Sequence, residues 1–417
     1  MSIEIKQKFF NINFLDGLKF SKASRDTNPI HINKLYGYNS MFGENIIHGV
    51  LTIIFFLKQL KFKKNFYLHS LHVKFLKSGK YNTPIYIKKK KNNSTHYEFS
   101  FLQEEQIITI VDIKILINKN FNQIKINEDY WEIFKKISYY TGVKYPGKNS
   151  LLHEIDIEKN EKKREVKDKD LKISSKFLDK RLPFIKNNFL FKDYKIKFIS
   201  LKRPTIKLKK SKPNIKVTNT ISKIKNNVMI IGASQGLGRD LLNLIKKNKK
   251  INIVATSFKN RIKIKNKNIK KIRLDVTKDT KILTKHIKRL SPIRIYYFAT
   301  RKIDFDKKIS KKKLKEYENF FINYPLKILS ENKSDNLSFF YPSTEFIDFN
   351  KNFPYSKIKL QAEKKISEYC SLNNIKFINH RFSAINSRQS ASFSEIKNQN
   401  LAEYLIKNEK ILSKIFL

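Results

Sequence analysis

VMIIGASQGLGRD, residues 228–240, contains three of the ten glycines of this 417-residue chain. The apolar residues 228–231 are typical of a buried strand, and the residues after Gly238 have the periodicity of a helix. Between such elements, glycines permit a tight turn and a close approach of the backbone to a pyrophosphate, which the N–H groups of the helix start can bind. We therefore predict a dinucleotide-binding loop. Its predicted contact residues are Gly232, Ser234, Gln235, Gly236, Leu237 and Gly238.

Around this loop, residues 226–417 alternate strand-like with helix-like segments. Further short apolar runs occur at 252–257, 271–274, 294–299 and 337–341. Strands that alternate with helices indicate a parallel sheet with helices on both faces. We predict that residues 226–417 form an α/β Rossmann domain with a doubly wound parallel sheet.

Tyr355 and Lys359 lie four residues apart in YSKIK, so they share one face of a predicted helix. A lysine ammonium one turn from a phenol favours the phenolate and lowers the pKa of the tyrosine. Such a pair can act as a general acid and base near neutral pH. The alternative is an amphipathic surface helix, because this spacing also arises by chance in a chain with 19 Tyr and 88 Lys and Arg.

Several motifs follow one another in a fixed order: the glycine loop, Asp275-Val276 after a strand, Ser343 after another strand, and Tyr355 with Lys359. As a set they resemble the short-chain dehydrogenase/reductase family over residues 226–390. The resemblance implies that Tyr355 exchanges a proton with the substrate oxygen and that Lys359 holds the nicotinamide ribose. It also implies that Ser343, or else its neighbour Thr344, hydrogen-bonds the reacting carbonyl.

The same resemblance assigns further cofactor residues. Asn323 would support the lysine and a proton-relay water, and Asp275, with Val276 and Ala299 nearby, would meet the adenine side of the cofactor. Residues 256–259 contain no acidic side chain for a ribose 2′-hydroxyl, whereas Lys259 or Arg261 could meet a 2′-phosphate. We therefore predict NADP(H) in preference to NAD(H).

In the N-terminal part, SRDTNPIH (residues 24–31) places Asp26 and His31 five residues apart, with Pro29 restraining the loop. A carboxylate and an imidazole that hold one water can add its elements across a double bond. His48-Gly49 precedes a continuous apolar run at 50–57, and an N–H at such a helix start can polarise a thioester carbonyl. The alternative is that Asp26 and Asn28 are turn or cap residues and that His31 is a packed side chain.

The combined string D-x-N-P-I-H, Tyr36 and His48-Gly49 resembles the MaoC-like, (R)-specific enoyl-CoA hydratases of the hotdog fold over residues 8–118. The resemblance implies that Asp26 and His31 are catalytic. It implies that Asn28 orients them and that the Gly49 N–H binds the thioester oxygen.

The predicted organisation has four parts. Residues 1–118 form a hotdog dehydratase domain of one helix and an antiparallel meander, and 119–207 form a second, degenerate hotdog without the Asp-Asn-Pro-His motif. Residues 208–225 are predicted as a linker and 226–417 as the reductase domain. The fold class is thus an α+β double hotdog followed by an α/β Rossmann domain.

The formal net charge of +52 suggests a nucleic-acid partner, but lysines far outnumber arginines and occur in every segment. This is the composition expected from an AT-rich genome, and we predict no specific nucleic-acid binding. His69, His72, His96 and His153 have no Cys or carboxylate at ligand spacing, so no metal site is predicted. One cysteine and no apolar stretch of membrane-spanning length predict a cytoplasmic protein without a transmembrane segment.

The predicted function is a bifunctional enzyme on acyl-CoA or acyl-carrier-protein thioesters, acting as a homo-oligomer. An NADP(H)-dependent 3-oxoacyl reductase and an (R)-3-hydroxyacyl dehydratase (enoyl hydratase) share the 3-hydroxyacyl intermediate. One alternative is a short-chain reductase for a nucleotide sugar or another biosynthetic substrate, with a non-catalytic hotdog pair. A second alternative is a non-catalytic basic binding protein.

Overall fold

The computed structural model divides the chain into two compact units, Met1–Thr205 and Ile206–Leu417. It describes residues 3–62, 66–91, 93–117, 123–148, 150–159, 172–179, 183–203, 214–278, 280–304, 308–333, 336–383, 385 and 399–416.

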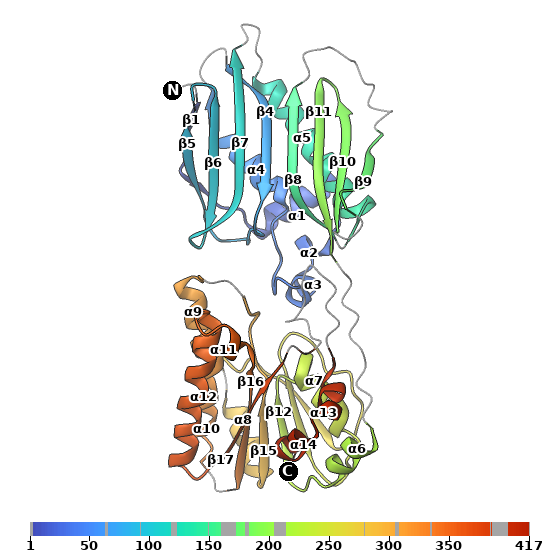
Figure 1. Cartoon of the computed structure of the whole chain (residues 1–417), viewed down its shortest axis with the longest axis vertical. Helices are drawn as coiled ribbons and strands as arrows, with labels where there is room; N and C mark the ends of the chain where they lie inside the picture. The colour runs from blue at the N-terminus through green and yellow to red at the C-terminus, as the bar shows by residue number, and fades with distance from the viewer. Residues whose placement is uncertain are drawn as a thin grey trace. The chain divides into compact units, whose positions relative to one another are not determined.

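The first unit is built on a nine-stranded antiparallel sheet (Figure 1). In sheet order the strands are β2 (Phe9–Phe10), β5 (Ile85–Lys91), β6 (His96–Gln103), β7 (Gln106–Ile117), β4 (Phe66–Phe75), β8 (Ser150–Lys159), β11 (Tyr194–Lys202), β10 (Phe184–Phe191) and β9 (Ser174–Phe177). A separate small pair joins β1 (Ile3–Ile5) to β3 (Leu60–Phe62).

The two halves of this sheet have the same topology. Helix α4 (Gly49–Gln59) precedes strands ordered β4-β7-β6-β5, and helix α5 (Gln123–Tyr139) precedes strands ordered β8-β11-β10-β9. The halves join where β4 pairs with β8, with Leu71 opposite Ile157. Both helices contribute to one core; Val50, Ile53 and Phe56 of α4 are buried in it. The predicted helix and meander are therefore present in the first half, and their topology recurs in the second.

The second unit contains a six-stranded sheet in which every pair of neighbours is parallel. In sheet order the strands are β14 (Ile269–Arg273), β13 (Ile253–Ser257), β12 (Asn227–Ile231), β15 (Ile293–Tyr297), β16 (Leu337–Thr344) and β17 (Lys376–Phe382). Numbered along the chain, this order is 3-2-1-4-5-6, the arrangement of a Rossmann fold. The predicted doubly wound parallel sheet is confirmed.

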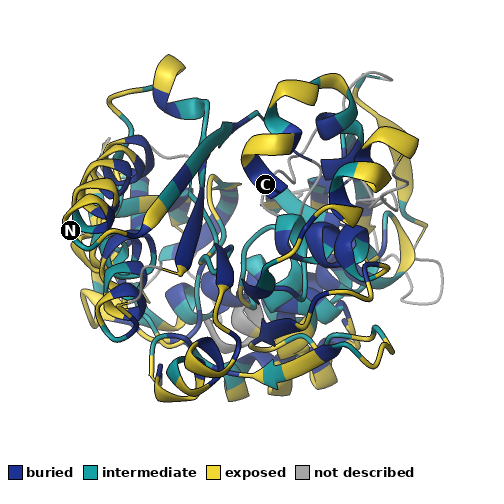
Figure 2. Ribbon diagram, turned by 90° about the horizontal axis from the view of Figure 1, so that it is seen from below, coloured by how far each residue is buried: buried dark blue, intermediate teal, exposed yellow. Residues whose placement is uncertain are grey.

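Helices cover both faces of the parallel sheet, and the side chains of β12 alternate between the two resulting cores. Val228 and Ile230 enter the core under α6 (Ile215–Ser222), α7 (Gly236–Ile245), α13 (Leu401–Lys407) and α14 (Glu409–Phe416). Met229 and Ile231 enter the core under α8 (Lys281–Arg289), α9 (Lys311–Glu318), α10 (Tyr324–Ser330) and α12 (Pro354–Leu372). The helices are buried on one side and exposed on the other, as the colouring of Figure 2 shows.

Several segments differ from the sequence-based expectation. Strands β1, β2, β3, β10 and β17 were not predicted. Helix α6 lies inside the stretch 208–225 that was predicted as a linker, because Val217 and Ile221, four residues apart, give it a buried apolar face. The almost entirely charged stretch Glu158–Asp170 is predicted from its composition to be a solvated hairpin or loop. Glu158 and Lys159 instead end strand β8, and the rest of the stretch lies outside the described residues. In the part of the chain that is described, no helix combines the length and apolar character needed to cross a membrane.

Candidate functional site

The segment that carries Asp26 and His31 is fixed by local capping. Helix α1 (Phe14–Ser24) ends at Arg25, whose φ of 59° is left-handed and turns the chain. Ser24 Oγ accepts the Asp26 N–H at 3.2 Å, and Ser21 Oγ donates to the Asp26 carbonyl at 2.5 Å. Pro29 then starts the short helix α2 (Pro29–Ile32), on which His31 lies. The backbone on both sides of the predicted catalytic pair is therefore held by short-range hydrogen bonds.

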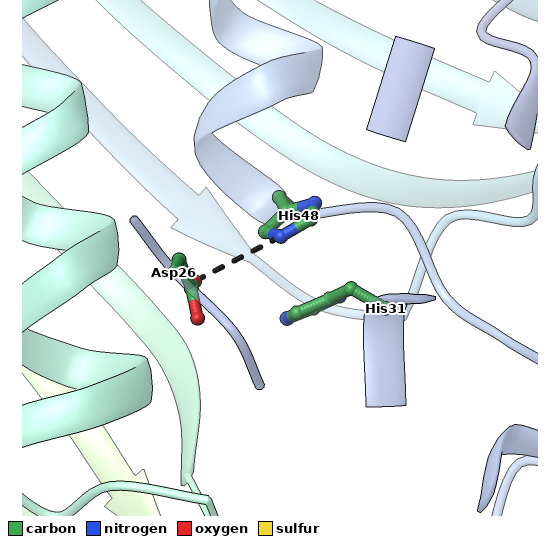
Figure 3. A group of neighbouring side chains, drawn as sticks. All are labelled: Asp26, His31 and His48. Carbon is green, nitrogen blue, oxygen red and sulfur yellow. Dashed lines mark ion pairs between the residues drawn. The ribbon is translucent and has the colours of Figure 1, made fainter. Parts of the chain in front are cut away.

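Asp26, His31 and His48 converge in the interior of the first unit (Figure 3). One carboxylate oxygen and one ring nitrogen of each histidine lie within 4.8 Å of one another. The exposed fractions of the three residues are 2%, 9% and 1%. The structure thus brings Asp26 and His31 together, as the sequence analysis expected, and adds His48, the residue at the N-terminal cap of α4.

The tautomer of His31 follows from its backbone contact. Its Nδ1 lies 2.8 Å from the carbonyl oxygen of Ile46, which can only accept, so Nδ1 carries the proton. Burial lowers the pKa of His31, Asp26 raises it, and the charge of Arg203 lowers it further, with a net decrease. A neutral ring with its proton on Nδ1 has a lone pair on Nε2. His31 can therefore accept a proton through Nε2.

His48 stacks on His31, with ring centroids 3.9 Å apart and planes inclined by 24°. Its Nε2 lies 3.9 Å from Oδ2 of Asp26 and has no hydrogen-bond partner among the described atoms. Burial, followed by the neighbouring His31, lowers the pKa of His48 well below its ordinary value. Both imidazoles are therefore neutral near pH 7.

The three side chains do not present the geometry of a tetrahedral metal site. A zinc ion needs both ring nitrogens at about 2.0–2.1 Å, with the lone pairs directed at one point. In two nearly parallel stacked rings the in-plane lone pairs run side by side. This arrangement fits a hydrogen-bonded molecule between Asp26 and a histidine better than it fits an ion.

Gly49 and Asn28, the predicted substrate-binding residues, lie beside this cluster. Gly49 is the first residue of α4, and the residue before it provides no side-chain cap, so the N–H groups of the first turn face outward from the helix end. A Cβ on Gly49 would lie 3.0 Å from the ring of Phe75. Asn28 contacts Asp26 through its backbone N–H, at 3.0 Å from Oδ1, while its side chain accepts the N–H of Ile30. Asn28 thus orients the carboxylate with its main chain.

Two residues of the second half of this unit reach the site and were missed by the sequence analysis. Ser138, on α5, donates through Oγ to Oδ2 of Asp26 at 2.6 Å. Arg203, at the end of β11, hydrogen-bonds Tyr36, and its charge acts on His31. Its Nη2 donates to the Lys148 carbonyl at 3.2 Å, whereas its buried Nε has no partner among the described atoms. The sequence offers one weak signal for Arg203, the string Lys202-Arg203-Pro204 near the end of the predicted second hotdog, and none for Ser138.

In the second unit, backbone conformation or lack of space explains why the loop has glycine at each of its three glycine positions. Gly232 and Gly236 have φ values of 89° and 59°, which favour glycine. A Cβ on Gly238 would lie 2.4 Å from the carbonyl oxygen of Gly232, and one on Gly232 would lie 2.9 Å from the backbone N of Ala299. Helix α7 begins at Gly236 with no side-chain cap. The loop thus leaves N–H groups of a helix start available for an anion, which fits a pyrophosphate.

The remaining predicted cofactor residues surround the carboxyl ends of the strands. Ser234, Gln235 and Leu237 are partly exposed, and Gln235 Oε1 accepts from Asn260 after β13 at 3.1 Å. Lys259 and Arg261, in the same loop, are exposed. Asp275 uses Oδ1 in a turn with Thr277, and Val276 is buried in the core.

Tyr355 and Lys359 share the buried face of α12, but the expected effect of the lysine on the tyrosine is absent. Burial raises the pKa of Tyr355. Lys359 Nζ instead donates to the Pro342 carbonyl at 2.5 Å and lies 3.9 Å from the centroid of the Tyr341 ring. Burial lowers the pKa of Lys359 to about 7, against the opposing charge of Glu363. The expectation that Lys359 lowers the pKa of Tyr355 is therefore wrong for this arrangement.

The structure places the two predicted site residues Ser343 and Asn323 in different surroundings. Ser343, on β16 next to Pro342, is buried, and its Oγ has no hydrogen-bond partner among the described atoms. Its alternative Thr344 instead accepts the N–H of Phe346 through Oγ1. Asn323 is exposed and donates to Asn319, while Phe321 faces Lys359 at 5.0 Å. The structure does not bring Asn323 to the lysine, because residues two apart on a helix do not share a face.

His72 also departs from expectation, since it has carboxylate neighbours that are distant in sequence. Its Nδ1 lies 2.5 Å from Oδ1 of Asp156 and 4.0 Å from Oε1 of Glu154, both on the adjacent strand β8. The hydrogen bond to Asp156 is the main cause of a raised His72 pKa; Glu154 and Asp112 contribute. The expectation that this histidine has no acidic partner is wrong.

Comparison with known proteins gives likeness at the level of structure alone. No protein-family model and no curated protein matches the sequence. A short chain dehydrogenase family protein from Francisella tularensis subsp. tularensis SCHU S4 is 18% identical, with 46% of this chain and 93% of that chain covered, at a TM-score of 0.37. A MaoC-like dehydratase is 5% identical, with 48% and 97% covered, at a TM-score of 0.34.

A third solved structure extends well beyond the matched region. UDP-glucuronic acid 4-epimerase from Bacillus cereus, in complex with NAD, is 18% identical over 38% of this chain, at a TM-score of 0.32. The match covers 56% of that enzyme, so this chain spans little more than half of its length. Solved structures that resemble this chain thus include short-chain dehydrogenases, a nucleotide-sugar epimerase and a MaoC-like dehydratase.

Proposed function

We propose that the first unit is a double hotdog that hydrates trans-2-enoyl thioesters and dehydrates (R)-3-hydroxyacyl thioesters, and that the second reduces 3-oxoacyl thioesters with NADP(H). The observation that carries the proposal is the buried convergence of Asp26 with His31, whose Nδ1 is tied to Ile46. That hydrogen bond leaves a proton-accepting nitrogen next to a carboxylate.

The proposal places a single water between these two groups. Two hydrogen bonds of about 2.8 Å that meet at a near-tetrahedral angle span roughly 4.5 Å, and the ligand atoms of the cluster lie within 4.8 Å. In hydration, His31 Nε2 accepts a proton from the water as its oxygen bonds to C3 of the enoyl group. The imidazolium beside Asp26 then returns that proton to C2, so the elements of water are added and no co-reactant is consumed.

The thioester carbonyl must be polarised while C3 is attacked. The uncapped first turn of α4 offers the Gly49 N–H and the positive end of a helix dipole for that oxygen. Charge that develops on the oxygen in the transition state is stabilised there. Gly49, packed on the Phe75 ring, leaves no side chain at this point of approach.

In the second unit, the glycine loop and the start of α7 would hold the pyrophosphate, and Lys259 or Arg261 would meet a 2′-phosphate. The nicotinamide, when bound, supplies the hydride. Ser343 Oγ, buried and without a partner among the described atoms, can donate to the substrate carbonyl. Tyr355, whose raised pKa keeps the phenol protonated, donates the proton to the forming alkoxide. In its ammonium form Lys359 has three donor positions and uses one on Pro342, which leaves others for ribose hydroxyls.

The two reactions share the (R)-3-hydroxyacyl thioester, which gives one chain a chemical reason to contain both sites. The test is mass spectrometry of an acetoacetyl thioester incubated with the full chain and NADPH. The proposal expects a gain of two hydrogens followed by loss of water. Asp26→Asn should abolish the loss of water and spare reduction. Tyr355→Phe should abolish the gain of two hydrogens, while it should still remove water from an (R)-3-hydroxybutanoyl thioester that is supplied directly.

Other outcomes contradict parts of the proposal, and a parallel incubation with a nucleotide sugar in place of the thioester tests the alternative substrate class. If the wild type reduces the thioester but does not dehydrate the product, the proposed dehydratase function is wrong. Turnover of a nucleotide sugar, with none of acyl thioesters, would replace the substrate class. If either variant keeps its own reaction, that site assignment is wrong.

A further inference from the structure

Asp26 is held by the two halves of the first unit in different ways. The first half fixes its backbone, through Ser21 and Ser24, and one carboxylate oxygen, through the Asn28 N–H at 3.0 Å. The other oxygen, Oδ2, accepts from Ser138 Oγ at 2.6 Å. Ser138 lies 112 residues further along the chain, on the central helix of the second half.

The contact has the character of a strong hydrogen bond. A hydroxyl that donates to an ionised carboxylate typically lies at about 2.5–2.7 Å, and such bonds are roughly twice as strong as neutral ones. Ser138 and Asp26 are both buried, so bulk solvent does not compete for the hydrogen bond between them. The helix that carries Ser138 is itself fixed by buried apolar residues, among them Tyr130, Phe134 and Ile137.

We infer that Ser138 is a positioning residue for Asp26, so that the second half, whose sequence lacks the Asp-Asn-Pro-His motif, completes the site of the first. The inference rests on the proposed dehydratase function and deepens it. Without the hydroxyl, the carboxylate keeps its backbone anchor and the Asn28 contact but can rotate at Oδ2. The Asp26 carboxylate would then no longer hold the water at a fixed distance from His31. The reaction rate would fall, because it depends steeply on how precisely the reacting groups are positioned.

The experiment compares variants of the full chain in the hydration of a trans-2-butenoyl thioester. Ser138→Ala is expected to lower kcat by about ten- to a hundredfold with KM changed by about twofold or less. Ser138→Thr retains a hydroxyl and is expected to recover most of the lost kcat. A rescue of this kind would not occur if the residue acted only through packing.

Ser150→Ala is the matched control. Ser150 is an equally buried serine of the second half, and its Oγ donates to the Thr141 carbonyl at 2.7 Å without touching Asp26. We expect it to retain kcat within about twofold. Near-ultraviolet circular dichroism and the Tm of each variant establish that the first unit is folded.

The failures of the two proposals are distinguishable. If the wild type hydrates the enoyl thioester and Ser138→Ala does so equally well, the positioning role of Ser138 is overturned, whereas the proposed dehydratase function is not. Equal losses in Ser138→Ala and Ser150→Ala would also overturn it, since the effect would then be structural. A folded wild type that hydrates no enoyl thioester overturns the proposed function and, with it, the role of Ser138.

Discussion

Gly142 packs directly on the carboxylate of Asp26: a Cβ at Gly142 would lie 2.2 Å from Oδ1 and 2.8 Å from Oδ2. Gly142 belongs to the π-helical turn η1 (Tyr140–Lys144) that continues α5. The turn therefore closes one side of the candidate dehydratase site with backbone alone, and any side chain at this position must displace either the turn or the carboxylate.

Replacing Gly142 by alanine is expected to impair hydration. Because real Cβ atoms do not approach other atoms so closely, either the turn or the Asp26 carboxylate must move, which disturbs the position of this carboxylate in the site, and we expect kcat to fall by about tenfold or more. Steady-state hydration of an enoyl thioester measures the change. Gly79→Ala is the control, since its Cβ would lie 3.3 Å from the flexible end of Ile47. Unchanged kcat in Gly142→Ala would show that the site tolerates the displacement.

Arg203→Met is expected to raise the pKa of His31. Burial is the main cause of the lowered pKa of this histidine, but the guanidinium charge of Arg203 acts in the same direction. Removing a positive charge stabilises the imidazolium, so the pH at which His31 becomes protonated moves upward. NMR titration of histidine ring carbons, with the signal assigned by His31→Gln, measures the shift.

The control for that titration removes the same charge from a neighbouring surface position. Lys148→Met eliminates an exposed lysine whose backbone carbonyl accepts from Arg203. Solvent screens a surface charge, so we expect a smaller shift. A fall in the His31 pKa of Arg203→Met, or equal shifts in both variants, would contradict the electrostatic contact.

Asn323→Ala is expected to leave 3-oxoacyl reduction within about twofold of the wild type. The side chain is exposed and donates to Asn319, away from Lys359, so its loss removes no described contact of the reductase site. Oxidation of NADPH in the presence of an acetoacetyl thioester, followed by absorbance, measures the rate. A loss comparable to that of Tyr355→Phe would mean that the asparagine acts in catalysis after all.

Local motifs were predictable from the sequence because few residues determine them. Pro29 and the Asn28 cap set the turn that separates Asp26 from His31, and the glycines between β12 and α7 are required by backbone conformation. The parallel, doubly wound class of the second unit follows from the alternation of strands and helices along the chain. These features depend on contacts between neighbours in sequence.

Contacts between distant residues were not predictable in this way. Ser138 and Arg203 reach the dehydratase site only because the two halves of the sheet join at β4 and β8. Strand β10 was missed because Asn187 and Asn188 interrupt its apolar pattern, and asparagine is disfavoured in strands. In the structure Asn187 is buried and donates to Ile185, Phe198 and Ser200, which offsets its desolvation.

The last prediction concerns the ion pair between β4 and β8. The hydrogen bond to Asp156 raises the pKa of His72 above its ordinary value of 6.5, so the pair contributes stability in full below that value. The contribution is lost as the pH rises through the folded-state pKa, because the neutral imidazole no longer pairs with the carboxylate. Asp156→Asn should therefore lower the His72 pKa and destabilise the first unit more at about pH 6 than at about pH 9.

NMR titration of His72, together with urea unfolding of the full chain at both pH values, tests this expectation. Glu154 and Asp112 also face the imidazole, so part of the raised pKa should survive in the variant. Glu158→Gln, two residues along the same face of β8 and opposite Ser70, removes an equal charge without contacting His72 and should leave its pKa close to the wild-type value. If Asp156→Asn destabilises the protein equally at both pH values, the contribution of this aspartate arises from packing or from its fixed charge. The protonated pair would then not hold the two halves of the sheet together.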